Sequence, residues 1–223
     1  MKIQPVKLDK ALANGEPIDP PLAKLIFDKT LSLLLLVLTS PLILLVLVAG
    51  VIEGLLVPAN RGLFLHRETR VSQGRPFTLF KFRILKVPAI REIERGAVPK
   101  LVENASGSLT ALGRFLKKYG LDELPQLWNI LRGDMSFVGP RPKPVAEYEA
   151  GLARGEIHRR LLRAGLTGPA QNLKGTEYTF EDVVAADLEY LEKCRTLSGA
   201  QLVRYDLSVL RRTMRVVGGG TGE

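Results

Sequence analysis

Cysteine and histidine are scarce in this chain, and their scarcity excludes two common kinds of site. Cys194 is the only cysteine among the 223 residues, so no disulfide can form within the chain, as suits a reducing compartment. His66 and His158 are the only histidines and lie far apart in the sequence. A zinc centre is therefore not expected, whereas a hard cation held by carboxylate and phosphate oxygens is compatible with the composition.

Acidic residues are fewer than basic ones. The sequence has 23 of them against 32 lysines and arginines, which gives a net charge of +9. This excess favours anionic partners such as phosphorylated substrates, acidic lipid headgroups or nucleic acid. The basic residues are scattered around an apolar segment and form no nucleic-acid-binding motif, so no nucleic-acid partner is expected. A length of 223 residues is enough for one domain with a substantial core.

Charge is absent from residues 31–51, which read LSLLLLVLTSPLILLVLVAGV. This run is about as long as a helix that crosses a bilayer. It begins well inside the chain and no clear small-residue cleavage site follows it, so a cleaved signal peptide is a poor explanation. The run therefore predicts a membrane helix.

Ser40 and Pro41 lie at the midpoint of this run. Proline removes one backbone hydrogen bond and kinks a helix, and a serine hydroxyl can satisfy a carbonyl freed at the bend. Positive residues, which favour the cytoplasmic side, flank both ends of the run: Lys24 and Lys29 before it, and Arg61, Arg67 and Arg70 after it. The residues alone leave two topologies open, a straight span and a helix that bends at Pro41 and returns to the same face.

The rest of the chain predicts one hairpin and several helices. Strands are expected over 63–68 and 76–83, joined across 72–75, and helices over 110–119, 122–131, 147–163, 180–193 and 201–217. Residues 88–108 are weakly patterned and predict either helix or loop. The last helix has one apolar stripe with arginines beside it, formed by Val203, Leu207, Leu210, Met214 and Val217. Such a helix either lies on anionic lipid or packs on the protein core.

Two adjacent carboxylates, Asp122 and Glu123, open the predicted helix 122–131. Acidic residues in this position commonly cap a helix and suit its dipole. The same place is where a helix N-terminus holds anions, and a carboxylate there can bind a divalent cation or attack phosphorus. The two roles are compatible, so the pair is a candidate catalytic and metal-binding group.

Arg141 lies between Pro140 and Pro142, which hold it in stiff, extended backbone. A guanidinium on a rigid loop is a good bidentate phosphate clamp, although an isolated arginine of this kind more often forms a surface ion pair. Lys81 and Arg83 share one face of the second strand, and Lys117 lies on a basic helix side, where such residues are usually solvated. Cys194 is expected to be a buried small apolar residue and not a nucleophile.

Taken together, these strings closely resemble the bacterial sugar transferase family, the monotopic phosphoglycosyl transferases. The matching segments occur in the family's order and cover nearly the whole chain. They are Lys24 to Asp28, Ser40-Pro41, Gly74-Arg75-Pro76-Phe77 with Lys81-Phe82-Arg83, Leu121-Asp122-Glu123-Leu124-Pro125-Gln126, Gly133-Asp134-Met135-Ser136, Val138-Gly139-Pro140-Arg141-Pro142 and Gly165-Leu166-Thr167-Gly168. The stretch from Asp122 to Pro142 is highly specific to this family.

The resemblance implies a reaction that starts the assembly of a glycan on a lipid carrier. Sugar 1-phosphate would move from a nucleoside diphosphate sugar, expected to be a UDP-sugar, to polyprenyl (undecaprenyl) phosphate, with release of UMP. Asp122 would be the nucleophile that forms a phosphosugar-aspartyl intermediate, and Glu123 would assist proton transfer and orientation. Mg²⁺ would bridge Asp122 and the diphosphate. The substrate-binding residues expected from the resemblance are Lys81, Arg83, Lys117, Arg141 and Arg163.

The resemblance also implies a fold and a location. Family members use a re-entrant membrane helix bent at Ser-Pro, so Ser40 and Pro41 would form the hinge and both helix ends would lie in the cytosol, at the bacterial inner membrane. The expected fold is α+β and mostly helical, with amphipathic interfacial helices and a small β-hairpin around a cytosolic active site. The expected parts, as in minimal single-domain members, are an N-terminal arm (1–22), a re-entrant membrane helix (23–57), a catalytic domain lying on the membrane (58–217) and a flexible tail (218–223).

Three places depart from the family pattern. A single cation, Lys24, stands where a basic pair is usual before the membrane helix, and Lys117 stands where an arginine is usual. Lysine cannot clamp phosphate in the same bidentate way. The segment from Arg163 to Pro169 lacks the family's tryptophan, which bears on the sugar or nucleotide preference and not on the reaction class.

Two other functions compete with the transferase. A non-catalytic basic membrane module that binds anionic lipid or tethers a partner explains the charge and the apolar run, but gives no reason for the Asp122-Glu123 pair. A hydrolase would cleave nucleotide sugars with water and form no lipid-linked product. Membrane lipids are expected contacts of the transferase. A membrane enzyme of this size can also form a homodimer through its helices, although no heptad run specifies a contact.

Overall fold

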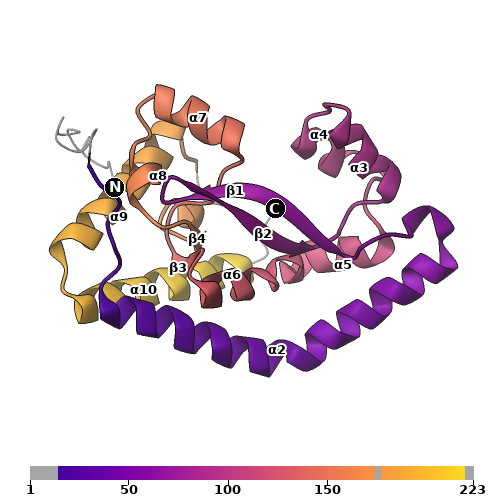
Figure 1. The fold of residues 1–223 in the computed structure, drawn as a ribbon, viewed down its shortest axis with the longest axis horizontal. Coiled ribbons are helices and arrows are strands. Elements are labelled where there is room, and N and C mark those ends of the chain that lie inside the picture. The colour runs from indigo at the N-terminus through magenta and orange to yellow at the C-terminus, as the bar shows by residue number, and fades with distance from the viewer. Residues whose placement is uncertain (1–14, 174–176, 219–223) are drawn as a thin grey trace. The chain divides into compact units, whose positions relative to one another are not determined.

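The structure, a computed structural model, describes residues 15–173 and 177–218 (Figure 1). Most of these residues lie in helices, as the sequence predicts. Residues 15–21 of the expected N-terminal arm form no regular secondary structure, and residues 1–14 lie outside the described part. The expected tail lies outside it as well, except for Gly218, which ends the last helix.

The apolar run forms one long helix, α2 (Leu22–Leu56). The helix continues through Pro41, and the Ser40 hydroxyl donates to the carbonyl of Val37 at 2.8 Å, a bond that occupies a carbonyl near the proline. Among the described residues, α2 is the one helix that is long and apolar enough to cross a membrane. Only 11% of its most apolar window is buried within the protein, so the helix is largely exposed to its surroundings.

The predicted hairpin is confirmed. Strands β1 (Leu65–Ser72) and β2 (Arg75–Phe82) pair with each other as a two-stranded antiparallel sheet. The turn between them places Gln73 at a φ of 52° and Gly74 at a φ of 74°, the left-handed backbone that two-residue hairpin turns favour. The first strand is longer than the predicted 63–68 because it runs up to this turn.

The remaining elements follow in chain order. They are η1 (Pro58–Asn60), α3 (Val87–Glu94), α4 (Pro99–Asn104), α5 (Ala111–Tyr119), η2 (Leu121–Glu123), α6 (Gln126–Arg132), β3 (Ser136–Val138), α7 (Val145–Ala153), α8 (His158–Leu161), β4 (Gly165–Thr167), η3 (Gln171–Leu173), α9 (Phe180–Thr196) and α10 (Gly199–Gly218). The predicted helices 110–119, 180–193 and 201–217 correspond to α5, α9 and α10. The undecided segment 88–108 contains α3 and α4.

Two predicted helices are wrong in their extent. The prediction over 122–131 fails at its start, because α6 begins at Gln126 and Asp122 lies in the 3₁₀ turn η2. Pro125 has no backbone N–H, so the helical hydrogen bonds start again after it. The prediction over 147–163 joins α7 and α8, which are separated at Gly155, where a φ of 92° cannot continue a helix.

The short parallel pair β3–β4 was not predicted. Ser136 pairs with Gly165 and Val138 with Thr167. Strands of three residues are too short to show an alternating pattern, so periodicity gave no signal for them.

The chain divides into two compact units. Unit 1 comprises Met1–Leu33, Glu68–Leu79 and Trp128–Glu223, and unit 2 comprises Leu34–Arg67 and Phe80–Leu127. The core of unit 2 joins Val46 of α2, Phe82 of β2 and Leu116 of α5. In unit 1, α10 contacts both β3 and β4, and Tyr190 of α9 is one of the largest fully buried side chains.

The face that α10 packs on unit 1 is not the apolar stripe predicted from the sequence. Leu202, Asp206 and Val209 are buried, whereas Leu207 is 37% and Met214 is 66% exposed. The side chain of Val217 lies outside the described part. Val203 and Leu210 are half-buried, so packing on unit 1 accounts for only part of the stripe.

Candidate functional site

The acid pair Asp122-Glu123 lies in η2, in the short connection between α5 and α6. Both ends of α5 carry the expected stop signals. Thr110 caps its start, accepting a hydrogen bond from the backbone N–H of Gly113 at 2.8 Å, and Gly120 ends it with a φ of 64°. The preceding and following residues, Leu121 and Leu124, pack against the unit 2 core. The turn that bears the two carboxylates is therefore fixed on both sides by apolar contacts.

This position changes the acidity of Asp122. Burial is the main cause that raises the pKa of Asp122 to about 6, and the neighbouring charge of Glu123 raises it further. The positive charge of Lys81 opposes both effects. At neutral pH the carboxylate of Asp122 is mostly ionised, yet it is held in a partly desolvated place. A poorly solvated carboxylate with a nearby cation is a good nucleophile or ligand for a hard cation.

Glu103 is a member of this environment that sequence reasoning missed. Its carboxylate forms an ion pair with Lys117 at 2.9 Å and adds a small upward effect to the pKa of Asp122. Glu103 belongs to α4, within the weakly patterned segment, so no motif or periodicity pointed to it. Lys117, expected to bind substrate, is thus engaged by a protein carboxylate.

Arg83 directly follows β2 and is buried, whereas cationic side chains on strands are usually solvated. Its side chain is buried and donates from Nη2 to the backbone carbonyl of Asn60. Burial lowers the pKa of Arg83, and the charge of Glu53 opposes this effect. The Nε of Arg83 is buried as well and has no hydrogen-bond partner among the described residues.

The second candidate segment, the loop Gly139–Pro142, follows β3 in unit 1. The N–H of Gly139 donates to Thr167 and the N–H of Gly165 donates to Pro140, each at 2.9 Å. A Cβ at position 139 would lie 2.3 Å from the carbonyl oxygen of Arg163, so the backbone approaches too closely for any residue other than glycine. Arg141, the predicted phosphate clamp, is an exposed residue on this fixed loop.

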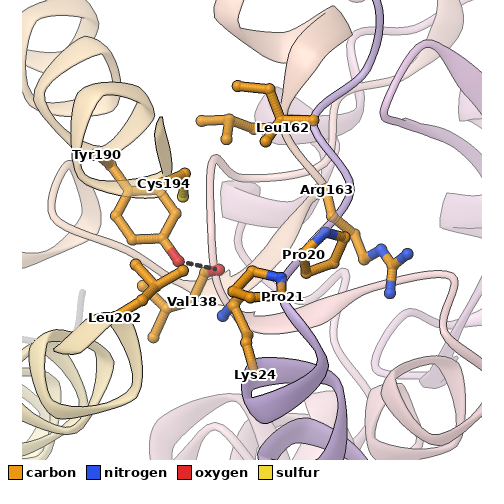
Figure 2. Close-up of a pocket in the computed structure, with 10 residues that line it drawn as sticks. Pro20, Pro21, Lys24, Val138, Leu162, Arg163, Tyr190, Cys194 and Leu202 are labelled. Carbon is orange, nitrogen blue, oxygen red and sulfur yellow. Dashed lines mark hydrogen bonds between the residues drawn. The ribbon is translucent and has the colours of Figure 1, made fainter. Parts of the chain in front are cut away.

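Arg163 lines a small pocket in unit 1, together with residues from the start of α2, α9 and α10 (Figure 2). Burial lowers the pKa of Arg163, and the carboxylates of Asp28, Asp19 and Asp134 oppose this shift. The Cys194 thiol lines the same pocket, and burial raises its pKa to about 11, which agrees with the expected unreactive cysteine.

Buried polar contacts fix β3 from the side of α2. Asp28 accepts from the Ser136 hydroxyl at 2.8 Å and from the N–H of Phe137 at 3.3 Å. Lys24 is buried and forms an ion pair with Asp206 of α10. The Tyr190 hydroxyl lies 3.1 Å from the Val138 carbonyl, a contact drawn in Figure 2. Sequence reasoning treated Lys24 as a cation flanking a membrane helix and found no role for Tyr190.

A protein-built metal cage is not found within residues 15–173 and 177–218. No group of three or more histidine, cysteine, aspartate or glutamate side chains is arranged there so that it could hold a metal ion. Asp122 and Glu123 provide two adjacent carboxylates, a donor set that suits Mg²⁺ when substrate phosphates complete the coordination. The residues therefore fit a magnesium ion that binds together with its substrate.

Of the residues predicted for the site, unit 2 contains Ser40, Pro41, Lys81, Arg83, Lys117, Asp122 and Glu123, and unit 1 contains Arg141 and Arg163. Residues 20–220 of the chain match the family model of the bacterial sugar transferases. The chain belongs to the bacterial sugar transferase family. The resemblance drawn from the motifs is thereby confirmed, and the match covers both units.

Curated relatives of this sugar transferase support the assignment. The galactosyl transferase CpsE of Streptococcus agalactiae is 33% identical, over 78% of this chain and 40% of its own length. The UDP-glucose:undecaprenyl-phosphate glucose-1-phosphate transferase of Escherichia coli is 34% identical, over 81% of this chain and 40% of its own length. The uncharacterized sugar transferase EpsL of Bacillus subtilis is 30% identical, over 87% of this chain and 86% of its own length. The chain therefore spans about two fifths of the first two relatives. The apolar helix and the lipid phosphate in the second relative's name indicate association with a membrane.

Proposed function

We propose that the chain is a phosphoglycosyl transferase that moves a sugar 1-phosphate from a UDP-sugar to undecaprenyl phosphate and releases UMP. The observation that carries the proposal is the fixed turn of Asp122, where a partly buried carboxylate has a pKa of about 6 and a cation, Lys81, nearby. Family membership and the names of the relatives support the same reaction class. A module that only binds lipid has no use for a carboxylate held in this costly environment.

The proposed chemistry has two displacements at one phosphorus atom. In the first, a carboxylate oxygen of Asp122 attacks the phosphorus that carries the sugar, and the bond to the bridging oxygen of the diphosphate breaks, so that UMP leaves with the electron pair. In the second, a phosphate oxygen of undecaprenyl phosphate attacks the same phosphorus and the bond to Asp122 breaks. Glu123 would accept the proton that the acceptor phosphate loses in the second step and release it to solvent afterwards. The carboxylate of Asp122 is regenerated and a lipid-linked diphosphate sugar is formed.

Cations supply the charge neutralisation on which phosphoryl transfer depends. We propose Lys81, Arg83 and Lys117 of unit 2, and Arg141 and Arg163 of unit 1, as contacts of the diphosphate or nucleotide. Lys117 would exchange Glu103 for a substrate phosphate. Asp122 would hold Mg²⁺ together with diphosphate oxygens, and the ion would neutralise charge on the transferred group. Chelation with EDTA is then expected to abolish UMP release without lowering the melting temperature, because the protein forms no metal cage of its own in the described part.

The membrane arrangement is a further part of the proposal. We propose that α2 enters the cytosolic face of the bacterial inner membrane, bends at Ser40-Pro41 and returns, so that both of its ends stay in the cytosol. Leu207 and Met214, the exposed members of the apolar stripe of α10, support contact with lipid. They lie on the same helix as the exposed residues Arg204, Arg211 and Arg215. Single cysteines introduced at positions 16 and 59 in a Cys194→Ser background would test the topology. Both should react with an impermeant thiol reagent from the cytosolic side; reaction of one from each side would show a span.

The reaction itself is tested by UMP release in the presence of Mg²⁺ and undecaprenyl phosphate. UDP-glucose and UDP-galactose are the first donors to try, since the relatives' names mention glucose and galactosyl transfer. Release should require the lipid phosphate and should fall at least about 10³-fold in Asp122→Asn. The matched control, Glu149→Gln, alters an exposed acid of α7 and should act like the wild type. When the UDP-sugar is labelled in its sugar and no acceptor is present, the label should become covalently bound to the wild-type protein and not to Asp122→Asn.

Other outcomes separate the rival functions. UMP release that does not need lipid phosphate, with free sugar phosphate as product, would identify a hydrolase. Membrane binding that is unchanged in Asp122→Asn, with no release from any UDP-, dTDP- or GDP-sugar, would favour the non-catalytic module.

A further inference from the structure

Unit 1 contains a buried group of charged and titratable side chains that the proposed chemistry does not use. Glu156, His158, Arg159 and Asp187 come from α8, the residues just before it, and α9. All four are buried, with exposed fractions of 3%, 0%, 8% and 1%. Placing charges in the interior is costly, so a group of this kind calls for an explanation beyond stability.

Arg159 is the centre of this group. Its Nε donates to Glu156 Oε2 at 2.8 Å, and its Nη2 lies 3.4 Å from Asp187 Oδ2. Glu156 Oε1 also pairs with Arg154 at 2.8 Å. Nε2 of His158 lies 3.3 Å from Asp187 Oδ2, although neither ring nitrogen of His158 has a hydrogen-bond partner among the described residues. Two carboxylates thus fix the plane of the Arg159 guanidinium.

The remaining nitrogen of this guanidinium reaches the loop of the predicted phosphate clamp. Nη1 of Arg159 donates to the backbone carbonyl oxygen of Arg141 at 2.8 Å. Arg141 and Arg159 also line one small pocket in unit 1, together with Pro140, Tyr148 and Lys143. The buried charged group is therefore connected, through Arg159, to the backbone carbonyl of Arg141. The position of this backbone determines the position of the Arg141 side chain.

Backbone hydrogen bonds fix the parts of the loop on either side of that peptide group. On one side, Gly139 and Pro140 are hydrogen-bonded to β4, and on the other the carbonyl of Lys143 accepts from the N–H of Val71 at 2.9 Å. Pro140 and Pro142 have no N–H to donate, so this stretch has few backbone donors of its own. Between these two attachments, the Arg141 carbonyl accepts from the Arg159 side chain.

We infer that Arg159 is a positioning residue that acts through Arg141, and that Glu156 and Asp187 serve to orient it. The inference rests on the proposed function, in which Arg141 binds the diphosphate of the nucleotide sugar. A guanidinium has the planar, forked set of donors needed to reach two carboxylates and one carbonyl at once, whereas a lysine ammonium in the same place cannot satisfy all three. Because small displacements of a binding group have large effects on rate, the position of the Arg141 carbonyl matters to turnover.

A double-mutant cycle tests whether Arg159 acts through Arg141. Arg159→Lys is expected to lower kcat/KM for the UDP-sugar about tenfold, mainly through KM, because Arg141 contacts the donor before and during reaction. In the Arg141→Ala background the same substitution should change kcat/KM less than about twofold. The matched control is Arg154→Lys, which alters another arginine paired with Glu156 but removes no hydrogen bond to the loop. It should leave kcat/KM unchanged in both backgrounds.

A second measurement needs no turnover. Hydrogen–deuterium exchange in peptides that cover residues 139–147 should become faster in Arg159→Lys and remain unchanged in Arg154→Lys. If Arg159→Lys does not fold, as judged by its melting temperature, Asp187→Asn takes its place in both experiments, since it keeps Arg159 and removes the charge of its farther anchor.

The outcomes distinguish the inference from the function on which it rests. Equal losses from Arg159→Lys with and without Arg141, or unchanged exchange in the loop, would overturn the positioning role while leaving the transferase intact. No UMP release by the wild type would count against the proposed function, and the exchange experiment would then still decide whether Arg159 holds the loop.

Discussion

Two short segments carry the candidate chemistry, and they are held in place by opposite means. The turn of Asp122 in unit 2 lies between leucines that pack on an apolar core. The loop of Arg141 in unit 1 is held by backbone hydrogen bonds and by a buried guanidinium. Apolar surroundings keep a carboxylate poorly solvated and so raise its pKa, whereas a polar, hydrogen-bonded loop gives a cation a defined position. Each kind of support suits the group that it holds.

Substitutions in the loop of Arg141 should lower the free energy of unfolding more than substitutions near the turn of Asp122. In Gly139→Ala the new Cβ would lie 2.3 Å from the Arg163 carbonyl oxygen, so backbone must move, and we expect a loss of about 4 kcal/mol or more in the free energy of unfolding. Gly96→Ala is the matched control: its φ of 102° is strained for alanine but nothing lies within 4 Å of the new Cβ, and a loss of about 1 kcal/mol is expected. Denaturant unfolding in a single detergent compares them. Similar losses would mean that close approach at Gly139 is not what holds the loop.

In α5, the helix before the turn of Asp122, substitution of a buried residue should destabilise the protein more than substitution of an exposed one. Leu116→Ala removes a fully buried side chain of the unit 2 core and should cost about 2–5 kcal/mol. Phe115→Ala, next to it in the sequence, removes a ring that is 50% exposed and should cost about 1 kcal/mol or less. Urea unfolding measures both. A larger loss from Phe115→Ala would show that the exposed face of α5 contributes to folding.

Removing the carboxylate of Asp122 should stabilise the protein. The pKa of Asp122 is raised from 3.8 to about 6, so between these pH values the folded state binds more protons than the unfolded state, and stability falls as the pH rises. At pH 7, Asp122→Asn should therefore raise the free energy of unfolding by roughly 1–3 kcal/mol, a gain that shrinks below pH 6 and disappears below about pH 4. Glu147→Gln, in an exposed pair with Lys143, should change it by less than about 0.5 kcal/mol. A loss of stability in Asp122→Asn would contradict the desolvated state of this carboxylate.

The smallest expected effect is a shift in the apparent pKa of the reaction when a charge near the turn of Asp122 is removed. Ionised Asp122 is the proposed nucleophile, so kcat/KM should rise with pH through about 6 and then level off. Lys81 opposes the effect of burial, and Lys81→Met should therefore move this apparent pKa upward by less than about one unit. Lys118→Met, which removes a cation lying over the exposed Tyr119 ring, should leave it in place. A pH profile that is flat from 5 to 8 would show that another group limits the reaction.

Local signals in the sequence account for what could be predicted. The hairpin and the helices α5, α9 and α10 are each determined by residues close together in the chain. The apolar run of α2 and the identity of the family were equally readable, because they depend on composition and on contiguous motifs. Asp122 was therefore found, although its turn was predicted as a helix because the effect of Pro125 was underestimated.

Contacts between distant residues account for what could not be predicted. The ion pair of Lys24 joins residues 182 positions apart, and the bond from Arg159 to the Arg141 carbonyl spans 18. A buried charge looks the same as a surface charge in a sequence, since its partner is supplied by folding. The strands β3 and β4 were missed for a similar reason: each is three residues long and is defined by the other.

One contact near the C-terminal end of α2 bears on whether another apolar helix could replace α2. The carboxylate of Glu53 accepts a hydrogen bond at 2.8 Å from the backbone N–H of Ala111, the first residue of α5, within unit 2. The long apolar helix thus also completes the start of the helix that leads to Asp122. A generic hydrophobic helix of equal length would lack this acceptor, so α2 is a part of the folded protein and not a detachable tether.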